Sequence, residues 1–114
     1  MLHNSVCFYY IDSMEQGSLT PERAFDELVD AIAATDDRDL IAEFLRSLLT
    51  KYEVDELTKR WALVRLIDQG MSQRNIAKEL GLSLCKITRG SKELKKENSA
   101  FGRMIGIYKK HTAV

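Results

Sequence analysis

Residues 71–95 read MSQRNIAKELGLSLCKITRGSKELK and predict two short helices joined by a tight turn. Ser72 and Ser83 each stand where a helix N-cap is expected, because a serine hydroxyl accepts a hydrogen bond from an N–H group of the first turn. Gly81 stands between them and can take the left-handed conformation that commonly ends a helix. Apolar residues recur at three- to four-residue spacing in both halves. The stretch therefore predicts a helix-turn-helix, and an ordinary helical hairpin with a solvated basic face is the alternative.

Basic residues gather toward the C-terminal end of the chain. Residues 1–50 contain 3 Lys or Arg and 10 Asp or Glu, whereas residues 71–114 contain 10 and 3. The second short helix carries its lysines and arginine opposite its apolar residues, and such charges supply most non-specific affinity for DNA phosphates. The distribution favours DNA binding, with chance clustering on solvated faces as the alternative.

Composition and residue spacing narrow the classes of protein to which the chain can belong. The 114 residues suggest one domain, and no run approaches 18 apolar residues, so no membrane association is expected. The N-terminus lacks the pattern of a secretory signal. Cys7 and Cys85 lie far apart, and no Cys or His spacing suits a metal ion. No activated nucleophile or acid–base pair is visible, so we expect a cytoplasmic protein that is not an enzyme and needs no cofactor.

The N-terminal half predicts an arm followed by two helices. Residues 1–19 show no sustained periodicity and are expected to form a flexible arm. Thr20-Pro21 is typical of a helix start, because proline at the first position loses no hydrogen bond. This helix is expected to end near residue 34. Thr35 and Asp36 are then expected to cap a second helix that carries apolar residues as far as Leu48.

Two further helices flank residues 71–95. Thr50 and Glu53 have the spacing of a capping box, so a third helix is expected from there to about residue 69. A last helix is expected over about residues 100–110. The expected apolar side of the third helix consists of Val54, Leu57, Trp61, Val64 and Ile67. The prediction is an all-α chain with six helices in a domain spanning residues 20–114, and its long apolar stripes favour oligomerisation.

The residue string in this stretch closely resembles the tryptophan operon repressor family. The shared segments are MSQR at 71–74, ELG at 79–81 and ITRGS at 87–91. The resemblance is strong over residues 71–95 and fair back to about residue 46. It implies an intertwined, all-helical homodimer that represses transcription. Its expected partners are a palindromic DNA operator of tryptophan biosynthesis or transport genes and the corepressor L-tryptophan.

The resemblance and the basic face together indicate which residues contact DNA. The N-terminal part of the second helix of the pair is expected to enter the major groove. Arg74 is expected to pair with guanine through both guanidinium nitrogens. Cys85 is interpreted as a small buried residue rather than a reactive thiol. A well-known family member has Thr at the position of Lys86 and Lys at that of Ala77, so a phosphate contact would have moved between the helices. The expected DNA-binding residues are Gln73, Arg74, Leu84, Cys85, Lys86, Thr88, Lys92 and Lys95.

The resemblance also implies a tryptophan pocket between the core and the helix-turn-helix. Two arginines, Arg60 and Arg89, would sandwich the indole ring, since a guanidinium stacks on aromatic faces and pairs with carboxylates. Thr50 would donate to the carboxylate, Gly90 would leave room beside the ring, and carbonyls near Ser47 and Leu49 of the partner chain would receive the ammonium. The expected ligand-binding residues are Ser47, Leu49, Thr50, Arg60, Val64, Arg89, Gly90 and Glu93.

Departures from the family pattern leave alternatives open. Glu93 replaces a serine and could bind the ammonium or neutralise Arg89, and Ser47 replaces an expected leucine. Arg60 could instead pair with Glu56, four residues before it. One alternative is therefore a regulator of the same fold with a different effector or none. A further alternative is a helical module whose basic face contacts an acidic protein.

Overall fold

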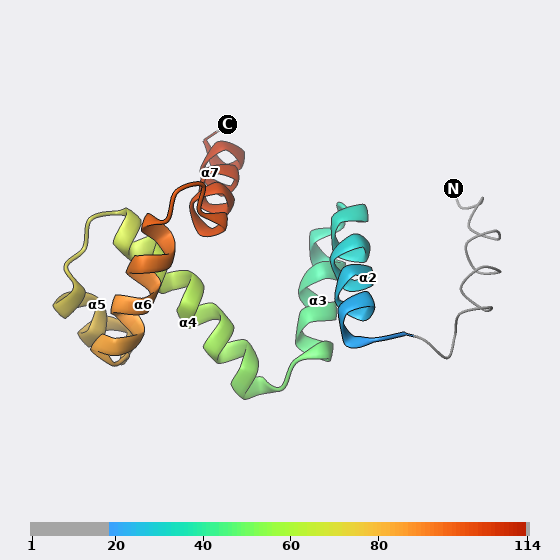
Figure 1. Cartoon of the computed structure of the whole chain (residues 1–114), viewed down its shortest axis with the longest axis horizontal. Helices are drawn as coiled ribbons and strands as arrows, with labels where there is room; N and C mark the ends of the chain where they lie inside the picture. The colour runs from blue at the N-terminus through green and yellow to red at the C-terminus, as the bar shows by residue number, and fades with distance from the viewer. Residues whose placement is uncertain (1–18, 114) are drawn as a thin grey trace. The chain divides into compact units, whose positions relative to one another are not determined.

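The computed structural model describes residues 19–113, and over these residues the chain forms six helices and no strand. The helices are α2 (Pro21–Ala34), α3 (Arg38–Leu48), α4 (Lys51–Asp68), α5 (Gln73–Leu80), α6 (Leu84–Lys95) and α7 (Ala100–Thr112) (Figure 1). Over residues 19–113 the predicted all-α class and the six predicted helices are confirmed. The arm predicted for residues 1–19 lies outside the described residues except for its last residue.

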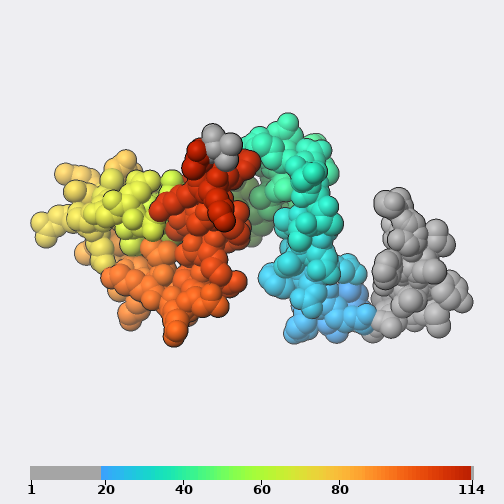
Figure 2. Space-filling view, turned by 90° about the horizontal axis from the view of Figure 1, so that it is seen from above, coloured from blue at the N-terminus to red at the C-terminus, as the bar shows by residue number. Residues whose placement is uncertain are grey.

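The chain divides into two compact units, residues 1–45 and residues 46–114. In the first, α2 and α3 lie side by side, and residues of both line a small apolar hollow. In the second, α4, α5 and α6 pack on one another, and α7 packs on α6 (Figure 2). The second unit contains the whole helix-turn-helix.

Capping side chains define most helix starts as predicted. Thr50 forms a complete capping box, in which the Glu53 N–H donates to Thr50 Oγ1 (3.1 Å) and the Thr50 N–H donates to Glu53 Oε1 (2.9 Å). Ser72 and Ser83 cap α5 and α6. Gly81, with φ of +66°, ends α5 in the left-handed conformation, and its N–H donates to the Ala77 carbonyl (2.9 Å).

The predicted cap of α3 was wrong. Asp37, rather than Thr35 or Asp36, caps this helix, because its Oδ1 accepts a hydrogen bond from the Leu40 N–H (3.1 Å). Thr35 instead ends α2 with an extended backbone, and its hydroxyl accepts from the Asp37 N–H (3.1 Å).

The core of the second unit lies where α4, α5 and α6 meet. Leu63, Ile76 and Ile87 are its centre, with 3%, 0% and 0% of their surface exposed. Leu63 was missing from the expected apolar side of the third helix, whereas Leu57 from that set is 46% exposed. Apolar residues occur around much of α4, so spacing alone did not show which side meets the helix-turn-helix.

Large apolar side chains remain exposed elsewhere. No residue of α2 or α3 is fully buried, and Phe25 on α2 is 64% exposed. On α7, Met104 and Ile107 are 55% and 61% exposed. Within the described residues, no helix combines the length and the apolar character needed to cross a bilayer.

Candidate nucleic-acid interface and adjoining pocket

Helix α6 is anchored by one side and exposed on the other. Ile87 and Ser91 are buried against the core, with 0% and 6% exposure. The first turn, by contrast, leaves Leu84 59% exposed. The residues predicted to contact DNA are all exposed: Gln73, Arg74, Leu84, Cys85, Lys86, Thr88, Lys92 and Lys95. The structure therefore leaves the starts of α5 and α6 open to a large partner.

The interpretation of Cys85 as a buried residue was wrong, since its side chain is exposed. It lies two positions before Ile87, which places it roughly 160° around α6 from the side that enters the core. The sequence shows a small residue at this position but not the rotation of α6 on α5. The exposed thiol lies on the same surface as Thr88 and Lys92.

Lys86 occupies a different side of α6 from the other exposed lysines. It lies roughly 120° around the helix from Lys92. Its ammonium forms an ion pair with Glu56 on α4, with Nζ to Oε1 at 3.3 Å. Lys86 thus joins two helices of the same chain while half of its side chain stays exposed, and its expected phosphate contact stays a prediction.

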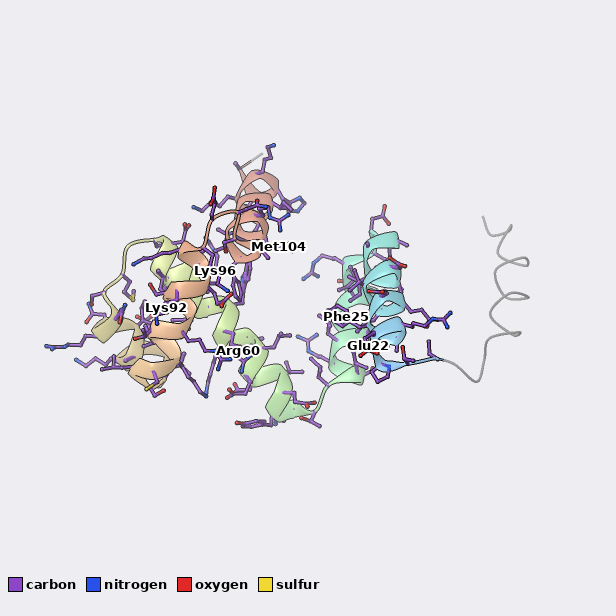
Figure 3. The ribbon with its side chains drawn as sticks, in the orientation of Figure 1. Glu22, Phe25, Arg60, Lys92, Lys96 and Met104 are labelled. Carbon is purple, nitrogen blue, oxygen red and sulfur yellow. The ribbon has the colours of Figure 1, made fainter. Side chains whose placement is uncertain are left out.

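A cavity of about 320 Å³ lies beside this ion pair. Arg60, in the middle of α4, is one of its lining residues (Figure 3). The residues that line it come from α4, the turn, α6 and α7, and are Glu56, Lys59, Arg60, Leu63, Val64, Leu82, Lys86, Arg89, Gly90, Glu93 and Phe101. Five of the expected ligand-binding residues are thus brought together: Arg60, Val64, Arg89, Gly90 and Glu93. Ser47, Leu49 and Thr50 do not line the cavity within this chain, and their role stays a prediction.

Some of the charged side chains around the cavity form ion pairs and others do not. Glu56 pairs with Lys86, Glu93 pairs with Lys96 (2.9 Å), and Lys59 pairs with Asp55 one turn away on α4 (3.1 Å). Arg60 and Arg89 form no ion pair with any residue in the described part of the chain.

These ion pairs bear on two alternatives that the sequence left open, the pairing of Arg60 with Glu56 and the neutralisation of Arg89 by Glu93. Glu56 is engaged by α6 rather than by Arg60, and Glu93 is engaged by Lys96 rather than by Arg89. Neither guanidinium group on the cavity wall forms an ion pair within residues 19–113. The wall contains four basic residues, Lys59, Arg60, Lys86 and Arg89, against two acidic ones, Glu56 and Glu93, so it carries excess positive charge.

Gly90 has a structural role beyond leaving room for a ligand. A Cβ added there would lie 2.8 Å from Leu63 Cδ2 and 3.8 Å from Val64 Cγ1. Glycine therefore lets α6 lie close to Leu63 on α4, and a larger residue at position 90 would require Leu63 or the helix to move.

Several wall residues were not predicted. They include Glu56, Lys59, Leu63, Leu82 and Phe101. Helical spacing carried a signal for two of them, since Glu56 lies four residues before Arg60, and Lys59 lies four residues before Leu63. Phe101 belongs to a helix whose packing the sequence did not show.

Residues 23–106 match the family model described as Trp repressor protein. The chain belongs to the Trp repressor family. It is similar to proteins named Trp operon repressor homolog from Xylella fastidiosa (35% identity over 81 residues, 70% of this chain and 88% of the relative) and Vibrio parahaemolyticus (34% over 79 residues, 68% and 77%). A third, from Vibrio campbellii, is 33% identical over 75 residues, 65% of this chain and 75% of the relative. No solved structure matches the chain significantly.

Membership of the Trp repressor family decides the broad class. Trp repressor proteins are transcription regulators and not enzymes, so the predicted absence of an enzymatic role is confirmed. The family also indicates a DNA-binding repressor, and α5 with α6 is the helix-turn-helix that the sequence predicted for that purpose. The family match therefore favours DNA binding over the alternative of a helical module that contacts an acidic protein.

Proposed function

We propose that this protein is a homodimeric repressor that binds a palindromic operator of tryptophan biosynthesis or transport genes when L-tryptophan occupies the α4–α6 cavity. One observation carries the proposal: Arg60 on α4 and Arg89 on α6 line the same cavity, and neither is neutralised within the described residues. Two free guanidinium groups suit a ligand that has both a planar ring and a carboxylate.

The cavity has the dimensions and lining of a small-molecule site. Its volume of about 320 Å³ lies at the lower end of the usual 300–1,000 Å³ range for such sites. Leu63, Val64 and Phe101 supply apolar wall, and the charged groups lie around it. An amino acid with an aromatic side chain combines these requirements.

A ligand in this position would affect the orientation on α4 of α6, the helix expected to enter the major groove and called here the reading helix. Arg60 belongs to the core helix and Arg89 to α6, so a molecule that contacts both favours one arrangement of the two helices. A ligand shifts such an equilibrium only by the difference between its affinities for the two arrangements. The arrangement it favours would be the one that fits the major groove.

Dimerisation is supported by the apolar side chains that one chain leaves exposed. Phe25 on α2 and Ile107 on α7 are more than half exposed, which is costly for side chains of this size in water. A two-fold dimer could cover them and would present two copies of α6 to the half-sites of a palindrome.

The exposed residues of α5 and α6 have the chemistry that operator recognition requires. Arg74 would pair with a guanine edge, and Lys92 and Lys95 would contact phosphates. Leu84, Cys85 and Thr88 in the first turns of α6 would lie near base edges, where apolar groups contact the thymine methyl. Gln73 would contact the DNA backbone beside Arg74.

A second candidate is a regulator of the same fold that needs no effector. The Lys86–Glu56 ion pair favours it, because this pair connects α6 to α4 through side chains of the protein alone. In that case the cavity would be a structural gap, and operator affinity would not respond to tryptophan.

Isothermal titration of L-tryptophan into the purified protein separates the two candidates, and calorimetry avoids interference from Trp61 fluorescence. Saturable heat in the wild type, lost in Arg89→Ala and kept in Lys92→Ala, is the expected result. Lys92 is a matched control because it lies on the same helix and does not line the cavity. No heat at millimolar tryptophan, or equal binding by the two variants, would contradict the proposed pocket.

A further inference from the structure

The ion pair between Lys86 and Glu56 joins elements that are distant in sequence. Glu56 lies in the first half of α4 and Lys86 in the first turns of α6, 30 residues later. The other ion pairs that involve cavity residues, Asp55–Lys59 and Glu93–Lys96, link neighbouring turns of one helix or its end. The Lys86–Glu56 pair alone among these fixes one helix relative to another.

Both partners also line the ligand cavity. Their carboxylate and ammonium groups form part of the same wall as Arg60 and Arg89. A movement of α6 relative to α4 at this point would act on the ion pair as well as on the cavity. The ion pair and a bound ligand would therefore both affect the position of α6 on α4.

We propose that the Lys86–Glu56 ion pair is a strut that holds the reading helix in its DNA-binding position when no effector is bound. Lys86 is thus a positioning residue and not a phosphate contact. This inference rests on the proposed function insofar as it concerns the effector. It implies that the ligand-free protein keeps part of its operator affinity, and that the ligand adds less than it would in a protein without the strut.

The partial exposure of the pair limits the expected effect. The Lys86 side chain is 51% exposed and that of Glu56 is 22% exposed. Pairs of this kind change an equilibrium by about 1.5- to 5-fold. A change of that size in the population of the held state is measurable and leaves the fold intact.

Amide hydrogen exchange of the ligand-free protein tests the strut without DNA or effector. Glu56→Gln and Lys86→Met should each speed exchange in residues 84–95 by about 1.5- to 5-fold, and the double variant should add nothing further. Asp55→Asn removes the neighbouring pair on α4, which does not involve α6, and should leave α6 unchanged. Unchanged exchange in α6 for both strut variants would overturn the proposal.

Operator binding gives the functional test. The probe is the duplex that the wild-type protein selects most tightly from a random-sequence library. Without tryptophan, Glu56→Gln and Lys86→Met should bind it about 1.5- to 5-fold more weakly, and saturating tryptophan should reduce that difference.

Two results would overturn the strut in this assay. One is tighter binding by Glu56→Gln, which would mean that Glu56 withholds Lys86 from a phosphate. The other is an equal loss in Lys86→Met with and without tryptophan, which would identify a direct DNA contact. If the wild type failed to bind tryptophan, the proposed effector would be wrong, while the exchange result would still decide the strut.

Discussion

Replacing Gly90 by alanine tests the close approach of α6 to α4. The new Cβ would lie 2.8 Å from Leu63 Cδ2 and 3.2 Å from Leu63 Cγ. Carbon atoms in contact prefer about 3.5–4.0 Å, so Leu63 or the helix must move by about 0.7 Å or more. Leu63 is 3% exposed and belongs to the core cluster, so it has little freedom to do so.

The expected change in the free energy of unfolding is the sum of two opposing contributions. Overpacking a filled core costs about 1–3 kcal/mol. Alanine is favoured over glycine inside a helix by about 0.8–1.0 kcal/mol, which offsets part of that cost. The net result for Gly90→Ala is a destabilisation of about 0–2 kcal/mol.

Gly106→Ala is the matched control. Gly106 also lies inside a helix, α7, and a Cβ there meets nothing within 4 Å. This variant should gain the helix-propensity term alone, about 0.8–1.0 kcal/mol. The difference between the two variants therefore isolates the overpacking term, about 1–3 kcal/mol.

Urea unfolding of the two variants and the wild type measures these shifts at constant protein concentration. The transition midpoint should fall or stay level for Gly90→Ala and rise for Gly106→Ala, with unchanged slope. In a Leu63→Ala background the clash is absent, so Gly90→Ala should stabilise as it does at position 106. Equal shifts for the two glycine variants in the wild-type background would refute the described packing of α6 on α4.

Three further substitutions address other parts of the structure. Thr50→Ala removes half of the capping box and should cost about 0.5–2 kcal/mol in urea unfolding, whereas Thr50→Ser should cost far less; equal losses would contradict the capping role. Ile87→Ala empties a site with no exposed surface and should cost about 2–5 kcal/mol, against about 0.5–1.5 for Ile87→Val. Lys92→Ala should weaken binding to all duplexes alike. It should also reduce the slope of the logarithm of the binding constant against the logarithm of the salt concentration by about one; an unchanged slope would show that Lys92 does not contact phosphate.

The boundaries of the helices could be predicted because their determinants are local. The hydroxyls of Thr50, Ser72 and Ser83 bond to N–H groups only three residues away, and Gly81 ends α5 by its own backbone conformation. Such signals are complete within a few positions of the chain. The exception, Asp37 at the start of α3, arose where several capping residues stand together and the length of the turn decides among them.

The orientation of each helix around its own axis could not be predicted in the same way. Leu63 enters the core and Cys85 faces water because of how α4 and α6 rotate against α5, and this depends on contacts between distant residues. The cavity residues Arg60 and Arg89 were found through the family resemblance and not through spacing. Whether they bind tryptophan stays a prediction.

Lys86 shows what the sequence alone did not reveal about one residue of α6, namely its ion pair with Glu56 on α4. Charge and helix membership grouped it with Lys92, yet the two point to different sides of α6, one toward Glu56 and the cavity and the other to solvent. Under the proposed function, this one short helix would carry residues for DNA on one side and residues for a ligand on the other. A molecule bound on the cavity side can influence DNA only by shifting the whole helix, and DNA must influence that molecule by the same free energy. Under the same proposal, the residues between α6 and α4, rather than those expected to touch DNA, would decide how strongly the two binding events depend on each other.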